Sequence, residues 1–175
     1  MAARAYAFRY ESRATLDAPA EAAFAYLDDF RQLSAHMERR SWMMLGSKMK
    51  IETDGADGRA VGSRVRMSGK ALGLTLALEE VVSHRDAPLR KSWETANANL
   101  LVIGPYRLGF ELERKGLASV VRVFIDYDLP AKPPARWLGR VFGRRYARWC
   151  VDRMLRDAIQ HLGRHQLIHV NGSRP

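Results

Sequence analysis

Apolar and polar residues alternate strictly near the start of the chain. Tyr6, Phe8 and Tyr10 begin an apolar series that continues to Leu16, and charged residues occupy most of the positions between them. A period of two with one apolar face predicts a half-buried strand. The strand is expected to end before Pro19, a residue that suits the first turn of a helix.

Two short helices are expected after this strand. The first would bury Ala23, Phe24 and Leu27, which share one side of a helix. A second helix would begin at about Asp29 and bury three apolar residues at helical spacing: Phe30, Leu33 and Met37. Neither helix is long enough to be stable alone, so both must pack against the rest of the chain.

The middle of the chain has the pattern of a sheet. Six strand-like segments, from MLGSKMKIET to SVVRVFIDYDLP, are separated by short turns rich in Gly, Asp and Pro. With the first strand they give about seven strands, joined by loops short enough for antiparallel neighbours. The segment PAKPP ends the sheet, because proline cannot continue a hydrogen-bonded ladder.

The remainder is helical in composition, but its apolar side changes near Gly143. Before Gly143, Leu138, Val141 and Phe142 share one side. Three arginines lie opposite them: Arg136, Arg140 and Arg144. After Gly143 a second apolar stripe points roughly the other way: Ala147, Val151, Met154, Leu155, Ala158 and Leu162. One straight helix cannot bury both stripes. We therefore expect a break or kink near Gly143, a short segment packed through its apolar side, and a long helix to about residue 165.

Length and composition limit the class of protein. A chain of 175 residues with 47% hydrophobic residues suits one domain over residues 1–175, with a core of about 6–165 and a tail at 166–175. One cysteine, Cys150, excludes an internal disulfide. The first residues lack the apolar part of a secretory signal, and no apolar stretch reaches the ~20 residues of a membrane span. These features predict a cytoplasmic protein.

The formal net charge of +10 attracts phosphate-rich partners. Most of the excess is arginine scattered along the chain, which is typical of a solvated surface, so nucleic acid is not the expected partner. RNA binding would need exposed aromatic and basic residues on one platform. The nearest approach to such a platform is Tyr146, Trp149, Arg153 and Arg156.

The order of these elements, together with four segments, resembles the START-related (SRPBCC) superfamily. This helix-grip group includes polyketide cyclase/dehydrase-like proteins, coenzyme Q-binding proteins and the major birch pollen allergen. The segments are ATLDAPAEAAFAYLDDFRQLSAHM, VGSRVRM, LEEVVSHRDAPLRKSW and VRVFIDYDLP, and the resemblance extends from Arg13 to about Leu162. It implies an α+β fold in which a curved antiparallel sheet wraps around a long C-terminal helix, with a hydrophobic cavity between them.

Inward alternation supplies a lining for such a cavity. The candidate ligand-binding residues are Met67, Leu74, Leu76, Leu78, Trp93, Tyr106, Phe110, Tyr127, Met154 and Ala158. A filled core made of the same residues is the alternative. His36 and Met37 are candidate gate residues, near the place where the family's cavity opens. Glu80 continues the inward register of Leu78, and because a buried carboxylate is costly, we expect a bulge or strand end to turn it outward.

The favoured function is binding of a hydrophobic or amphipathic small molecule such as a lipid, quinone, polyketide or aromatic metabolite. The first alternative is a cyclase or dehydratase using the same cavity, although the sequence offers few convergent polar side chains for catalysis. A further alternative is a membrane- or RNA-associated basic protein, with Arg136, Arg140 and Arg144 as candidate contacts to an anionic membrane.

No cofactor is expected. His161, His165 and His169 follow the i, i+4, i+8 spacing of a helix, but no carboxylate or cysteine completes a ligand set, so no physiological metal site is expected. The sequence also contains no phosphate-binding glycine loop and no CxxC pair.

Overall fold

A computed structural model describes residues 4–30, 49–71 and 74–171, with the backbone alone at residues 49, 70–71, 74–76 and 164–171. In these residues seven strands form one antiparallel sheet, accompanied by a short helix and a long C-terminal helix. The strands are β1 (Phe8–Leu16), β2 (Met49–Thr53), β3 (Arg64–Ala71), β4 (Leu74–Asp86), β5 (Arg90–Asn99), β6 (Tyr106–Lys115) and β7 (Ala118–Tyr127); the helices are α1 (Ala20–Asp28) and α4 (Pro133–Asn171).

The sheet is a meander with its first strand displaced to the far edge. Strands β2 to β7 lie in chain order, and β1 pairs with β7, so the order is β1-β7-β6-β5-β4-β3-β2. Tyr10 lies opposite Ile125 and Ser12 opposite Val123, which places the alternating series of β1 on the same face as the apolar residues of β7. The α+β helix-grip fold expected from the sequence is confirmed.

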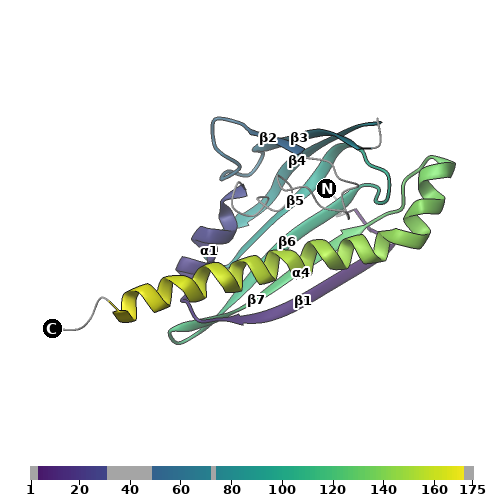
Figure 1. Cartoon of the computed structure of the whole chain (residues 1–175). Coiled ribbons are helices and arrows are strands. Elements are labelled where there is room, and N and C mark those ends of the chain that lie inside the picture. Colours follow the sequence, from purple (N-terminus) through teal and green to yellow (C-terminus); the bar gives the residue numbers. More distant parts are fainter. Residues whose placement is uncertain (1–3, 31–48, 72–73, 172–175) are drawn as a thin grey trace.

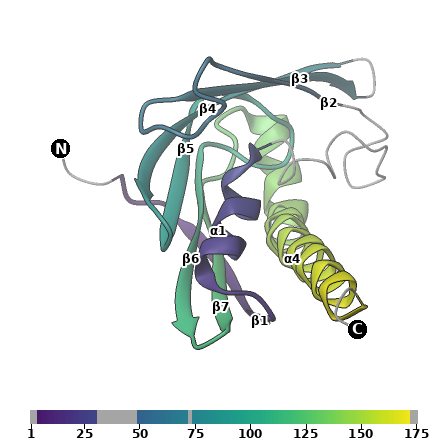
Figure 2. The same cartoon turned by 90° about the vertical axis from the view of Figure 1, so that its left-hand side faces the viewer.

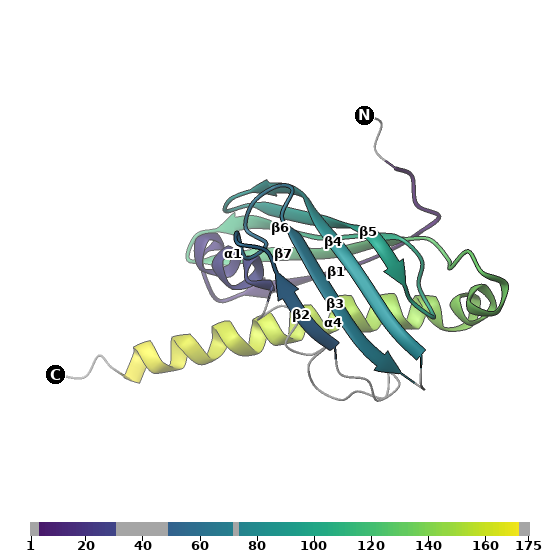
Figure 3. The ribbon, with the colours of Figure 1, turned by 90° about the horizontal axis from the view of Figure 1, so that it is seen from above.

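Both helices lie on the concave side of the curved sheet (Figure 2). Helix α4 packs along β1 and β7, and α1 fits between α4 and strands β6 and β7 (Figure 1). The opposite end of the sheet, formed by β2 and β3, curves over this side, and the C-terminal part of α4 extends past the sheet (Figure 3). The core consists of inward side chains from the sheet, α1 and α4.

Helix α4 is continuous and longer than expected, and of the two expected alternatives, a break or a kink, it shows a bend. It is one helix from Pro133 to Asn171, without a break at Gly143 and beyond the expected end at about residue 165. Its first turns stand at an angle to the rest, so a bend is present (Figure 1). The second apolar stripe is buried as expected, from Ala147 to Leu162.

The first turns of α4 pack through glycine, which corrects the prediction that Leu138, Val141 and Phe142 face the protein. Val141 and Phe142 are 48% and 42% exposed. Gly139 and Gly143, one turn apart, are buried, and a methyl group added to either would lie 3.2 Å or 3.1 Å from the carbonyl oxygen of Val102. Without side chains at these two positions, the helix backbone can approach the loop before β6 closely.

A second short helix is expected from about Asp29. Residues 31–48 lie outside the described residues, and they include Leu33 and the candidate gate residues His36 and Met37. Phe30 is described and is buried.

Candidate functional site

The concave face of the sheet and the facing side of α4 are almost entirely apolar. The structure brings most of the candidate cavity residues together there, each at most 5% exposed: Met67, Leu78, Trp93, Tyr106, Phe110, Tyr127, Met154 and Ala158. The side chains of Leu74 and Leu76 lie outside the described residues. These residues would be buried both in a ligand site and in a filled core, so their burial does not distinguish the two. The polar groups on this face indicate which chemistry it can perform.

Glu80 lies on this concave face, which corrects the expectation that it turns outward. Its exposed fraction is 1%. The pairing of β4 with β5 does shift next to it, but Glu79 lies opposite Asn97 and Glu80 opposite Thr95, so the extra residue of the bulge is Ala96 on β5. Because the bulge belongs to the partner strand, the alternation of β4 continues through Glu80 and keeps its carboxyl inside.

The Glu80 carboxyl has one hydrogen-bonded and one unpaired oxygen. The Tyr106 hydroxyl, from β6, donates a hydrogen bond to Oε1. The indole N–H of Trp93 is near enough to the carboxyl to lower its pKa, yet Oε2 has no hydrogen bond of ordinary geometry and is the one such buried side-chain atom in the described residues. Burial outweighs both donors and raises the pKa of Glu80 from 4.5 to about 7.

Two polar side chains of α4 complete this buried cluster. The Tyr146 hydroxyl and the Cys150 thiol interact with each other, and both groups interact electrostatically with Glu80. Burial raises the pKa of Cys150 to about 12 and that of the Tyr146 hydroxyl well above 10.0. Burial, followed by the charge of Glu80, does the same to Tyr106. Glu80 is therefore the group of this cluster that changes charge near neutral pH.

The other buried charges on the inner face neutralise each other. Lys91 Nζ, on β5, donates to Asp28 Oδ1 at 2.7 Å and to the Asp28 carbonyl oxygen at 2.9 Å, and it lies 4.4 Å from the centre of the Phe30 ring. Arg85 donates to the same carboxylate at 2.8 Å. Burial raises the pKa of Asp28, but the bonds from Arg85 and Lys91 outweigh it and the pKa is lowered. This cluster ties the end of α1 to the sheet.

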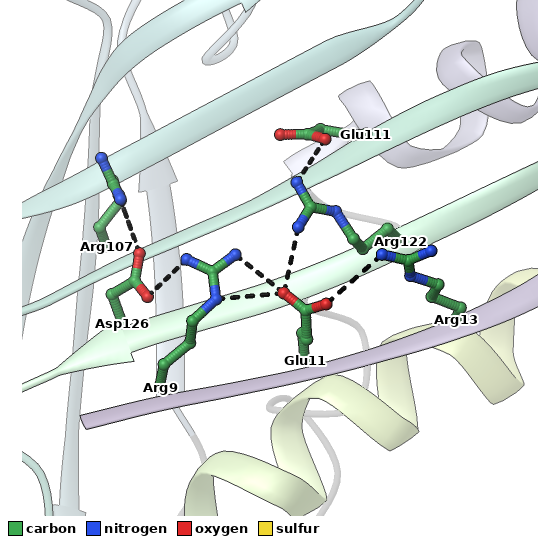
Figure 4. A network of polar contacts seen from close by, with 7 residues as sticks. All are labelled: Arg9, Glu11, Arg13, Arg107, Glu111, Arg122 and Asp126. Carbon is green, nitrogen blue, oxygen red and sulfur yellow. Dashed lines mark hydrogen bonds and ion pairs between the residues drawn. The ribbon is translucent and has the colours of Figure 1, made fainter.

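The outer face of the sheet carries a network of paired charges that the strand patterns did not reveal (Figure 4). Arg9 donates to Asp126 at 2.9 Å and to Glu11, Arg107 donates to Asp126 at 2.7 Å, and Arg122 donates to Glu11 and Glu111. The guanidinium groups of Arg9, Arg107 and Arg122 lie 5.0–5.9 Å from the centre of the Phe124 ring.

A groove of about 450 Å³ lies over this face, lined by these three arginines, Glu111, Phe124 and residues of β4 and β5. Each arginine of the network already uses its donors on a carboxylate, so a ligand would have to displace existing ion pairs. The groove therefore has less to offer a ligand than the unpaired carboxyl on the concave face.

Unpaired basic charge collects on the first turns of α4. Arg136, Arg140, Arg144 and Arg145 form no ion pair in the part of the chain that the structure describes, and Arg140 and Arg144 are exposed. Trp137, 64% exposed, and Val141 lie opposite the two packed glycines, and Phe142 is exposed beside them. Of the four residues that come nearest to an RNA platform in the sequence, Tyr146 has a buried hydroxyl and its ring packs against that of Trp149.

His161 stacks on Tyr26, with ring centres 4.3 Å apart. The side chains of His165 and His169 lie outside the described residues, and the described ones contain no group of three potential metal ligands. Among the described helices, none combines the length and the apolar character that crossing a membrane requires.

A curved antiparallel sheet gripping a long C-terminal helix defines the helix-grip class of proteins. Within it, the chain belongs to the family described as "Polyketide cyclase / dehydrase and lipid transport", whose model matches residues 7–164. The resemblance to the START-related superfamily is thereby confirmed. No protein of curated function matches the chain in sequence.

Solved structures share the fold at low sequence identity. A Thermus thermophilus protein has 15% identity and a TM-score of 0.65, covering 88% of this chain and 96% of its own. Truncated norcoclaurine synthase from Thalictrum flavum has 13% identity and a TM-score of 0.62, covering 91% of this chain and 96% of its own. A START superfamily protein from Mycobacterium smegmatis has 13% identity and a TM-score of 0.55, covering 88% and 98%. At these identities the likeness concerns the fold alone.

Proposed function

We propose that this protein binds a hydrophobic or amphipathic small molecule, such as a lipid, quinone, polyketide or aromatic metabolite, in an internal cavity between the sheet and α4. Transport or sequestration of that molecule in the cytoplasm would follow from such binding. The family description, which joins cyclases, dehydrases and lipid transport, supports this class of ligand.

The observation that carries the proposal is an apolar concave face with a single unsatisfied polar atom, Glu80 Oε2, among the described residues. Small-molecule sites combine apolar walls with a few placed polar groups. A core selected for stability alone would not retain a carboxyl there, because an unpaired buried polar group costs about 1–3 kcal/mol. Met154, 3% exposed on α4, belongs to the apolar wall.

A pair of tryptophan variants on α4 tests the cavity. Met154→Trp should fill the space and weaken binding of a fluorescent hydrophobic probe, whereas Ile159→Trp adds the same side chain at a position that is 45% exposed and should leave binding unchanged. Circular dichroism establishes that both variants fold. Equal probe binding by a folded Met154→Trp would exclude a cavity beside Met154. Native mass spectrometry of the protein purified from its own host would then identify any retained ligand.

A cyclase or dehydratase-like reaction is the second candidate function, and the Glu80–Tyr106 pair is the observation that favours it. A carboxyl with a pKa of about 7 exchanges protons readily near neutral pH, as a general acid or base must. If Glu80 assists enolisation of a bound ketone, wild-type protein in heavy water should accelerate deuterium incorporation beside the carbonyl, and Glu80→Leu should not. Equal rates, measured by NMR, would leave binding as the function.

Membrane contact by the first turns of α4 is a separate part of the proposal. Arg136, Arg140 and Arg144 are unneutralised there, in contrast to the paired arginines of the outer sheet face, and Trp137 is exposed among them. Arginine beside exposed aromatic and aliphatic side chains suits the interface of an anionic bilayer, where each basic residue near the surface contributes about 1 kcal/mol. Exposed Val141 favours lipid over nucleic acid, because an aliphatic side chain offers bases no stacking surface.

Liposome co-sedimentation tests this contact. Changing Arg136, Arg140 and Arg144 together to Gln should weaken binding to anionic vesicles roughly a hundredfold. The matched control changes Arg148, Arg153 and Arg156, which interact with Asp152 or Asp157 on the same helix, and should weaken binding far less. Equal losses in the two triple variants would refute a specific surface, and RNA binding that persists at physiological salt would favour the other partner.

A further inference from the structure

Glu80 differs from every other buried charged residue in the described structure. Asp28 and Lys91 pair with each other, and Asp126 pairs with Arg9 and Arg107. Glu80 has no basic partner, and although the Trp93 indole N–H lies near its carboxyl, its Oε2 has no hydrogen bond of ordinary geometry. A group left in this state on the concave face points to a partner that the chain itself does not supply.

The hydrogen bond that Glu80 does make fixes which of its oxygens is free. Tyr106 donates its only hydroxyl hydrogen to Oε1 of Glu80, which therefore acts as the accepting oxygen. When Glu80 is a neutral acid, its own carboxyl hydrogen is then on Oε2. An O–H at this position donates and needs an acceptor. Among the uncharged acceptors without a hydrogen that an apolar ligand can carry, a carbonyl oxygen accepts more strongly than an ether oxygen and therefore suits this donor best.

The surroundings hold Glu80 in the neutral form that this bond requires. The titratable groups facing it are Tyr106 from β6 and Tyr146 and Cys150 from α4, and all three have raised pKa values that keep them uncharged between pH 5 and 9. Burial likewise raises the pKa of Glu80 to about 7. A ligand carbonyl would favour the acid, whereas a ligand hydroxyl or amine would favour the carboxylate.

We propose that Glu80 Oε2 donates a hydrogen bond to a carbonyl oxygen of the bound molecule, so that the protein selects apolar ligands that carry a ketone-like group. The selection rests on the proposed binding of a small apolar molecule inside the protein. Tyr106 is a positioning residue in this arrangement, since it orients the carboxyl through Oε1 without contacting the ligand.

Two matched fluorescent probes test the assignment: propionyl(dimethylamino)naphthalene, a ketone, and its propyl analogue, in which a methylene replaces the carbonyl. Wild-type protein should bind the ketone roughly tenfold more tightly at pH 5.5 than at pH 8.5, because the acid form is lost above its pKa. The propyl analogue should bind with the same affinity at both pH values.

Variants at position 80 separate the hydrogen bond from the cavity. Glu80→Gln keeps a donor and should bind the ketone with no pH dependence, and Glu80→Leu should lose the preference for the ketone while still binding the propyl probe. Glu79→Gln, next to it on the outer face, should keep the wild-type pH dependence.

Three results would overturn the assignment in distinguishable ways. Equal, pH-independent binding of both probes by wild-type protein would exclude the carbonyl contact and leave the proposed cavity intact. Ketone affinity that rises with pH would exclude the acid form of Glu80 as the donor to the probe carbonyl. Failure of both probes to bind folded wild-type protein would remove the proposed binding function and this inference with it.

Discussion

Replacing Glu80 by Gln should change how the stability of the protein depends on pH. The folded protein holds the Glu80 proton up to a pKa of about 7, whereas the unfolded chain releases it near 4.5. Below pH 4.5 both states carry the neutral acid and the group costs nothing. Between these two values only the unfolded chain is ionised, so the stability of the wild type falls as the pH rises, and it stays low above pH 7.

The size of this loss follows from the two pKa values. At about 1.4 kcal/mol per pKa unit, the change from 4.5 to about 7 corresponds to about 3 kcal/mol of unfolding free energy. Glu80→Gln resembles the neutral acid in shape and can still accept the hydrogen bond from Tyr106. The variant should therefore match the wild type at pH 4.5 and exceed its stability by up to about 3 kcal/mol at pH 8, or by about 10 °C in Tm for a chain of this length.

Urea unfolding at several pH values, followed by circular dichroism, measures the difference directly. Glu79→Gln is the matched control, because hydrogen bonds from Arg66 and Arg64 lower the pKa of Glu79 and its contribution is therefore lost as the pH falls. The two variants should deviate from the wild type in opposite directions. If Glu80→Gln follows the wild-type curve from pH 4.5 to pH 8, Glu80 does not carry the buried proton and the reasoning fails.

Two further predictions concern the packing of the fold. Asp28→Asn leaves the Lys91 ammonium buried without its counter-charge and should lower the free energy of unfolding, measured in urea, by about 3–5 kcal/mol. The double variant Asp28→Asn with Lys91→Met should recover part of this loss. An unchanged urea midpoint in the single variant would show that the ion pair does not stabilise the fold. Gly163→Ala places its added methyl group with no atom within 4 Å and should raise the free energy of unfolding by about 0.5–1 kcal/mol. Gly139→Ala places its methyl group 2.7 Å from Pro130 Cδ and should lower the Tm. A gain in stability at both positions would contradict the close packing at Gly139.

Strand positions were predictable from the sequence because they depend on local alternation. The inward series of β7 reads directly from the residues, and its members Val121, Val123, Ile125 and Tyr127 are all buried, as is Leu78 of the β4 series. The placement of β1 beside β7 depends on contacts more than 100 residues apart, and no local pattern in the sequence predicted it.

The errors concern residues whose environment is set by a neighbouring element. Alternation placed Glu80 inside, and only the expected cost of burying a carboxyl argued for an outward turn; the bulge at Ala96 lies on the partner strand, which no pattern in β4 reveals. On α4, apolar residues were assigned to the packed side, but Gly139 and Gly143 form it. The spacing of these glycines, four residues apart, was the available signal for close backbone approach.

The two departures from charge pairing have a common physical meaning. Excess arginine accounts for most of the net charge of +10, and the outer sheet face neutralises its share with Glu11, Glu111 and Asp126. In the described residues, the arginines of the first turns of α4 have no acidic partners, and Glu80 has no basic partner. Both arrangements lower the stability of the fold. A glutamate among the arginines or a leucine at position 80 would remove that loss of stability. Proteins leave charged groups unpaired in this way chiefly where function requires it. A protein that receives an apolar carbonyl compound at an anionic surface and holds it inside would use both.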